Sequence, residues 1–231
     1  GDALGPQFQI NTEKSDFIFD LNSHHPEQGL SVAALGDGNF VATWRANEDA
    51  SFDVNQSDDL HNGIFGQIFD QYGSKIGSEF KVNTYDKSIG HDATPFEFGQ
   101  FSPSATSLKD GGFLVSWSSG DNVQGGNGDD VFAQVFNSYG AKIGEEFQLN
   151  THDNEHQLHS SVATLNNGQV VSAWQSSHAQ DGNGFGIFGK LIEVEGAYIE
   201  IPINKTYAMD DMADPSTIGI EVMYSGESYN F

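Results

Sequence analysis

The 231-residue chain contains no cysteine. Disulfide bonds, thiolate metal sites and thiol catalysis are therefore excluded. The chain also has no apolar run as long as a transmembrane helix, so we expect no membrane insertion. Its first residues, 1–5, lack the apolar core of a signal peptide. A secreted form would therefore need a leader that has been removed, or another export route.

Basic residues are scarce: 9 Lys and Arg stand against 33 Asp and Glu, which gives a formal net charge of −24. Such a charge repels phosphate backbones and anionic membranes, so a nucleic-acid partner is not expected. The acidic residues have two interpretations. They either form a solvated surface that keeps the protein soluble, or they take up cations that relieve the repulsion.

Recognisable catalytic motifs are missing as well. The chain has no Gly-x-Ser-x-Gly elbow, no His-Glu-x-x-His helix motif and no glycine-rich phosphate loop. Counting carboxylates does not by itself exclude a glycosidase-like pair, because Asp and Glu are abundant. From the missing motifs we predict that the protein is not an enzyme.

What the chain does contain is a repeat. A hairpin pattern with Asp-Gly, Gly-Gly or Asn-Gly between two apolar runs occurs three times, at residues 31–44, 104–117 and 161–174. We call its two strands A and B. Strand C follows at residues 63–69, 130–136 and 186–192. Strand D ends in apolar-x-apolar-Asn, at residues 8–12, 80–84 and 147–151, with a weaker copy at 201–204.

The order A-B-C-D predicts an all-β fold of tandem four-stranded antiparallel repeats, arranged as β-propeller-like blades. Packing of the same units as a sandwich or a solenoid stays open at this point. The expected organisation is an extra D strand and loop at 1–28, repeats at 29–84, 85–151 and 152–206, and a tail at 207–231. Tail strands are expected at 218–224 and 228–231.

Three units are few for a closed ring, which normally takes about 4–8 blades. One solution is a fourth, mixed blade that both termini close. The other is pairing of the terminal strands with a neighbouring subunit, which predicts a homo-oligomer or a filament.

The repeat resembles a tandem repeat of large secreted bacterial proteins of the RTX, or hemolysin, type, and of some protist surface proteins. The resemblance rests on Ser-Val-Ala-x-Leu with the hairpin Gly and Trp, then Gly-Ile-x-Gly-Gln-x-Phe, then Glu-Phe-x-Val-Asn-Thr. It covers the chain to about residue 204. It implies a secreted, extracellular location, an adhesion or structural role, and a propeller-like fold. The calcium-binding nonapeptide arrays of those proteins are absent here.

The B–C loops carry Asp, Asn and Gly in the combination from which calcium sites are built. The alternative is that these residues only form turns. The candidate calcium ligands are Asp53, Asp58 and Asp59 in the first loop, Asp121, Asn127, Asp129 and Asp130 in the second, and Asp181 and Asn183 in the third.

Histidine and tryptophan are two other residue types that could form binding sites. His152, His156 and His159 could gather zinc, but without helical spacing we favour solvated loop histidines, or next a pH-sensitive contact. The tryptophans that end strand B, Trp44, Trp117 and Trp174, are expected in the core, with stacking on a sugar ring as the alternative. The sequence thus predicts an extracellular structural or adhesion protein that self-assembles and binds calcium. The alternative is a lectin-like, glycan-binding propeller module.

Overall fold

The computed structural model describes residues 5–12, 29–47, 62–84, 99–120, 128–152, 155–177, 184–194, 222–224 and 227–229. The chain divides into two compact units, residues 1–197 and 198–231. Across the described ranges the regular structure is β-strand, apart from one short 3-10 turn, Gly36–Gly38. No helix in these ranges has the length and apolar character needed to cross a bilayer. The predicted all-β class is confirmed.

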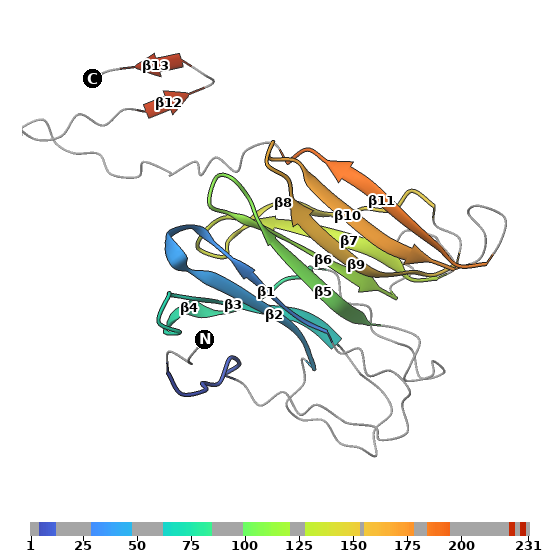
Figure 1. Ribbon diagram of the computed structural model, residues 1–231, viewed down its shortest axis with the longest axis horizontal. Coiled ribbons are helices and arrows are strands. Elements are labelled where there is room, and N and C mark those ends of the chain that lie inside the picture. The colour runs from blue at the N-terminus through green and yellow to red at the C-terminus, as the bar shows by residue number, and fades with distance from the viewer. Residues whose placement is uncertain are drawn as a thin grey trace, which may run out of the picture. The chain divides into compact units, whose positions relative to one another are not determined.

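Three antiparallel sheets make up the first unit, and we call them blades 1, 2 and 3 (Figure 1). Blade 1 comprises β1 (Leu30–Ala34), β2 (Phe40–Asn47), β3 (Asn62–Phe69) and β4 (Lys75–Lys81). Blade 2 comprises β5 (Gln100–Ser107), β6 (Phe113–Ser119), β7 (Asp130–Phe136) and β8 (Lys142–Gln148). Blade 3 comprises β9 (Gln157–Thr164), β10 (Val170–Ser176) and β11 (Gly186–Ile192). Strand order follows chain order in each blade, as the repeat predicts.

The A–B hairpins close as their sequence requires. In blade 2, Leu108 donates its backbone N–H to the carbonyl of Gly112 at 2.8 Å, and Gly111 takes a left-handed φ of 86°. Blade 3 closes in the same way, with Gly168 at φ 95°. A glycine adopts this backbone without the clash that a Cβ would bring, which explains why the position is glycine in all three hairpins.

A glutamine in strand C organises the outer edge of blades 1 and 2. The pairing of β7 with β8 is interrupted by a bulge between Ala133 and Val135. The amide nitrogen of buried Gln134 donates to the carbonyls of Val135, Ile143 and Gly144 at 3.0, 3.1 and 3.3 Å. Gln67 makes the equivalent bonds in blade 1. The buried amide thus links the bulged strand β7 to β8.

Blade 2 packs one face against blade 1 and the other against blade 3, and we call the corresponding faces of every blade its preceding and following faces. The following face of blade 1 meets the preceding face of blade 2 in one core that contains Val41, Ile64, Ile68, Phe113, Val115 and Trp117. Blades 2 and 3 meet through Leu114, Val131, Val135, Val162, Val170 and Trp174. Burying each such side chain contributes about 1.5–3 kcal/mol, so these interfaces are the main source of stability.

The first strands of the blades, β1, β5 and β9, lie side by side. Polar side chains link them: Ser31 Oγ accepts a bond from the Ala105 N–H at 3.0 Å. The same serine one repeat later, Ser104, accepts from the Val162 N–H at 3.2 Å. Sheets joined at their first strands, with their faces packed in sequence, are the arrangement of β-propeller blades. This packing decides between the alternatives that the strand pattern had left open.

The second unit contains one described hairpin, β12 (Val222–Tyr224) paired with β13 (Glu227–Tyr229). Both strands overlap the tail strands predicted at 218–224 and 228–231. The weaker D copy at 201–204 lies outside the described residues.

Candidate functional site

The first strands of blades 2 and 3 carry an unusual backbone near their starts. Ser102 has φ 53° and His159 has φ 56°, both in the left-handed region. Each lies at a bulge, where the pairing of β5 with β6 and of β9 with β10 shifts register. A non-glycine residue in this region costs about 1–3 kcal/mol, and such strain tends to be retained at functional sites.

These two residues hold the same place in the repeat, two positions before the hairpin serines Ser104 and Ser161. They also touch, because Ser102 Oγ lies 3.2 Å from Nδ1 of His159. The His159 N–H in turn donates to Ser118 Oγ at 3.1 Å. Equivalent positions of neighbouring blades therefore form a polar row across the first strands.

Blade 1 has Gly29 at this place. A Cβ built there would lie 3.1 Å from the Cα of Ser102, which is tighter than ordinary packing allows. The absence of a side chain at Gly29 keeps its backbone close to Ser102 and continues the row toward blade 1.

A second pair of polar side chains lies where the connection from blade 2 enters β9. His156 Nδ1 is 2.7 Å from Oδ2 of Asp129, and the histidine side chain is about half exposed. The Gln157 N–H donates to the Asp129 carbonyl at 2.7 Å. Burial raises the pKa of the Asp129 carboxyl, and the hydrogen bond and charge of His156 oppose that rise.

Backbone contact holds this pair in place. A Cβ built at Gly128 would lie 2.2 Å from the carbonyl oxygen of Glu155, so the glycine is required there. Glu155 itself has a left-handed φ of 62°. All three left-handed non-glycine residues of the described chain therefore lie at the end of the blades where the B–C loops begin, which we call the B–C end.

An exposed aromatic ring lies at the same end. Phe185 is 69% exposed and directly precedes Gly186, which pairs with Ser176 across the β10–β11 ladder. Ser177 directly follows β10. Its backbone N–H donates to the His156 carbonyl at 2.8 Å, and its Oγ accepts from the His156 backbone N–H at 3.0 Å. Phe185 thus lies at the same end of blade 3 as His156, connected to it through the Gly186–Ser176 pair and Ser177. We define the B–C site as Ser102, Asp129, His156, His159 and Phe185.

The structure covers two of the nine candidate calcium ligands. Asp130 is buried and accepts a 2.6 Å hydrogen bond from Asn150 Nδ2, while Asp129 is bound to His156. The other seven lie outside the described residues: Asp53, Asp58, Asp59, Asp121, Asn127, Asp181 and Asn183. Over the residues that are described, no group of three or more metal-binding side chains forms. The calcium site stays a prediction.

The three repeat tryptophans are core residues, as expected. Trp44, Trp117 and Trp174 are 7%, 1% and 6% exposed. Trp174 also donates its indole N–H to the Gln157 side chain at 3.2 Å. Because all three rings are buried, none of them can stack on a bound sugar.

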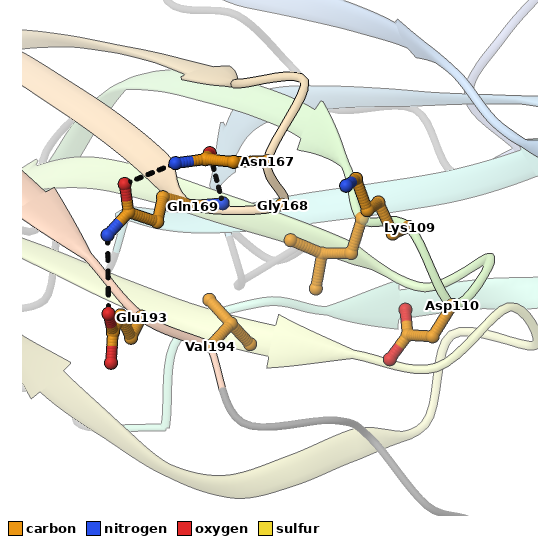
Figure 2. A pocket seen from close by; sticks show the side chains of 8 residues that line it. Lys109, Asp110, Asn167, Gly168, Gln169, Glu193 and Val194 are labelled. Atoms are coloured by element: carbon orange, nitrogen blue, oxygen red, sulfur yellow. Dashed lines mark hydrogen bonds between the residues drawn. The ribbon is translucent and has the colours of Figure 1, made fainter.

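A pocket of about 360 Å³ lies at the opposite end, between the A–B turns of blades 2 and 3 (Figure 2). Its polar groups bind one another: Asn167 Nδ2 donates to Gln169 Oε1 at 2.7 Å, and Gln169 Nε2 donates to Glu193 Oε1 at 3.2 Å. Lys109 and Asp110 line its other side and are exposed. The paired amides fix the turn beside the last described residues of blade 3, which is a structural role.

Only part of the B–C site was predicted from the sequence. His156 and His159 were predicted as solvated loop histidines, and Ser102 and Phe185 were not predicted as site residues. The sequence does contain a pattern that indicates this position. Gly29, Ser102 and His159 occupy the same place in the three repeats, and the glycine indicates a backbone position where side chains fit poorly.

No protein-family model and no curated protein sequence matches the chain. Solved structures do resemble it. An endo-arabinase from Bacteroides thetaiotaomicron is 17% identical over 72% of this chain and 56% of its own, with a TM-score of 0.45. A protein of unknown function from Dyadobacter fermentans is 12% identical over 72% and 51%, with a TM-score of 0.46. An alpha-L-arabinofuranosidase from Lactobacillus brevis is 12% identical over 69% and 48%, with a TM-score of 0.38. The chain spans about half the length of these proteins.

These comparisons correct one prediction. The chain was predicted not to be an enzyme because catalytic motifs are missing, but glycoside hydrolases are among the solved structures that resemble its fold. Missing motifs therefore do not exclude catalysis here. At 10–17% identity the likeness concerns the fold and assigns no reaction to this chain.

Proposed function

We propose that the protein is a glycan-binding propeller module and that neutral sugars bind at the B–C site. The observation that carries the proposal is the exposed ring of Phe185 at the same end of the blades as the His156–Asp129 pair. Sugar recognition needs an aromatic face for the apolar side of the ring together with hydrogen-bonding groups for its hydroxyls. The B–C site supplies both, and the tryptophans supply neither.

The polar groups suit hydroxyl recognition. Ser102, His156 and His159 offer hydroxyl and imidazole groups that both donate and accept hydrogen bonds. Their backbone is fixed by bulges and by contacts to Ser118 and Ser177, so little ordering is needed on binding. The net charge of −24 repels anionic polysaccharides, which favours neutral glycans.

The test is a panel of neutral and anionic oligosaccharides, followed by calorimetric titration of the best ligand. Phe185→Ala should weaken binding about tenfold or more, which corresponds to about 1.4 kcal/mol. The matched control is Tyr139→Ala, because Tyr139 is 77% exposed on the β7–β8 turn at the other end of blade 2. Equal affinity of Phe185→Ala and the unchanged protein, or a preference for anionic glycans, would overturn the proposal.

Two further roles remain proposals of the sequence: an extracellular adhesion role and calcium binding in the B–C loops. Both are compatible with glycan binding, since an adhesion module needs a ligand. Reducing ends should be measured in the same glycan samples, because their release would show that the site also hydrolyses what it binds.

A further inference from the structure

The following face of blade 3 is apolar and uncovered. Ile187 and Leu191 on β11 are 76% and 58% exposed. The residues at the same two repeat positions in blades 1 and 2 are 0–7% exposed, buried by the next blade: Ile64, Ile68, Val131 and Val135. The following face of blade 3 therefore resembles the apolar faces that are buried between blades, but none of the described residues covers it.

The preceding face of blade 1 is open in a complementary way. Val32 on β1 is 57% exposed, whereas Val162, at the same place in blade 3, is 8% exposed against blade 2. Leu30 is 77% exposed on the same face. Among the described residues, blade 3 thus has an exposed following face, and blade 1 has a preceding face whose inner part is exposed.

The outer part of the preceding face of blade 1 is covered by residues 5–12, which include the predicted extra D strand but form no regular strand in the structure. On blade 2, the equivalent cover comes from the end of β4, where Phe80 lies against Gly140 of the β7–β8 turn. On blade 1, Phe8 lies against Gly73 of the β3–β4 turn in the same way. Phe8 also packs on Phe69, with ring centroids 5.7 Å apart.

The polar contacts repeat too. Thr84, after β4, receives a 2.8 Å hydrogen bond from the Lys142 ammonium group, and its own N–H donates to Glu146 at 2.6 Å. Thr12 binds Lys75 and Glu79, the same lysine and glutamate one repeat earlier. Residues 5–12 therefore make on blade 1 the contacts that the end of β4 makes on blade 2, and so take the place of a preceding blade's outer strand.

This leaves two complementary halves. Residues 5–12 take the place of an outer strand on blade 1, and the described strands of blade 3 are A, B and C, with β11 at the edge (Figure 1). We infer that a second copy of this chain docks head to tail on the following face of blade 3, and that its residues 5–12, rather than the chain's own weaker D copy at 201–204, take the outer-strand place beside β11. The interface continues the two blade–blade interfaces that the chain already contains.

The count of blades supports two copies. Two copies bring six described blades together, which is within the range of about 4–8 that closed rings normally take. Each copy would use both of its open ends, once as donor and once as acceptor. Such a heterologous contact closes after two subunits when its rotation allows a ring.

The first experiment is light scattering after size exclusion at about 0.15 M salt, where repulsion between the acidic chains is screened over about 8 Å. The expected mass is twice the chain mass of 25.0 kDa. Ile187→Asp and Val32→Asp each place a carboxylate on one open face and should raise the dimer dissociation constant on the order of a hundredfold. Tyr139→Asp, on an exposed turn outside both faces, should leave the dimer unchanged.

Mixing the two face variants is the sharper test. Ile187→Asp keeps an intact blade 1 face and Val32→Asp keeps an intact blade 3 face, so a head-to-tail contact forms only between them. The mixture should therefore contain dimers, while each variant alone remains monomeric. Circular dichroism of each variant checks that it is folded. A monomeric unchanged chain, a ladder of larger species, or no dimer in the mixture would overturn the inference.

Discussion

Replacing Gln134 by leucine tests whether the repeat glutamine stabilises the bulge between strands C and D. The side chain is fully buried, and its amide donates to three carbonyls at 3.0–3.3 Å. Leucine removes the donors, at about 1–3 kcal/mol for an acceptor left unsatisfied in the interior such as the Val135 carbonyl, and less at the partly exposed Ile143 and Gly144. The cost is partly offset by the added apolar surface and by the loss of Gln134 Oε1, a buried oxygen without a hydrogen-bond partner. We expect a loss of about 2–4 kcal/mol in the free energy of unfolding.

The assay is urea unfolding followed by tryptophan fluorescence. For an m-value of about 2 kcal/mol per M, the midpoint should fall by roughly 1–2 M. Gln67→Leu should behave alike, because Gln67 makes the same bonds in blade 1. Lys190, the exposed residue at this position in blade 3, is the internal control, and Lys190→Leu should cost less than about 1 kcal/mol. A Gln134→Leu midpoint within error of the unchanged protein would refute the reasoning.

Three further results are expected. Trp117→Ala should cost about 3–5 kcal/mol in unfolding free energy, since the ring is buried between blades 1 and 2, and a smaller cost would place it outside the core. Asp129→Asn should leave the free energy of unfolding at pH 7 unchanged or raise it, as measured by urea unfolding. Burial raises the folded-state pKa of Asp129, so ionising this carboxyl costs stability that the neutral asparagine does not lose. That cost of ionisation is absent below the ordinary pKa of 3.8, grows as pH rises from 3.8 to the raised folded-state pKa, and is complete above it, so the variant's advantage should disappear in acid. Calcium should raise the melting temperature in a chelator-reversible way if the B–C loops bind it, and magnesium at equal ionic strength is the control.

The sequence was sufficient for the strands because the signals are local. The Gly111 hairpin and its copies lie between two apolar runs, and this pattern determines where each A and B strand turns. The core role of Trp117 followed from its repetition at one structural position. How the blades pack was not predictable in the same way, since it depends on contacts such as Ser31 with Ala105, 74 residues apart in the chain.

The B–C site was the harder part. Ser102 and His159 come together because the bulges in β5 and β9 turn them toward one another across two blades. Neither bulge has a glycine or proline signature shared by both strands. Asp129 was predicted as a calcium ligand from its acidic, glycine-rich neighbourhood, yet its carboxylate binds His156, a partner 27 residues away. Composition indicated the chemical groups but could not pair them.

The most direct test of glycan binding at the B–C end is an NMR titration of the imidazole and aromatic side-chain signals with the best neutral oligosaccharide. We expect the signals of His156, His159 and Phe185 to shift together, with one dissociation constant, while those of Tyr72 and Tyr139 on the opposite turns do not move. Shifts confined to the tyrosines, or saturating binding that leaves the two histidines and Phe185 unchanged, would contradict it.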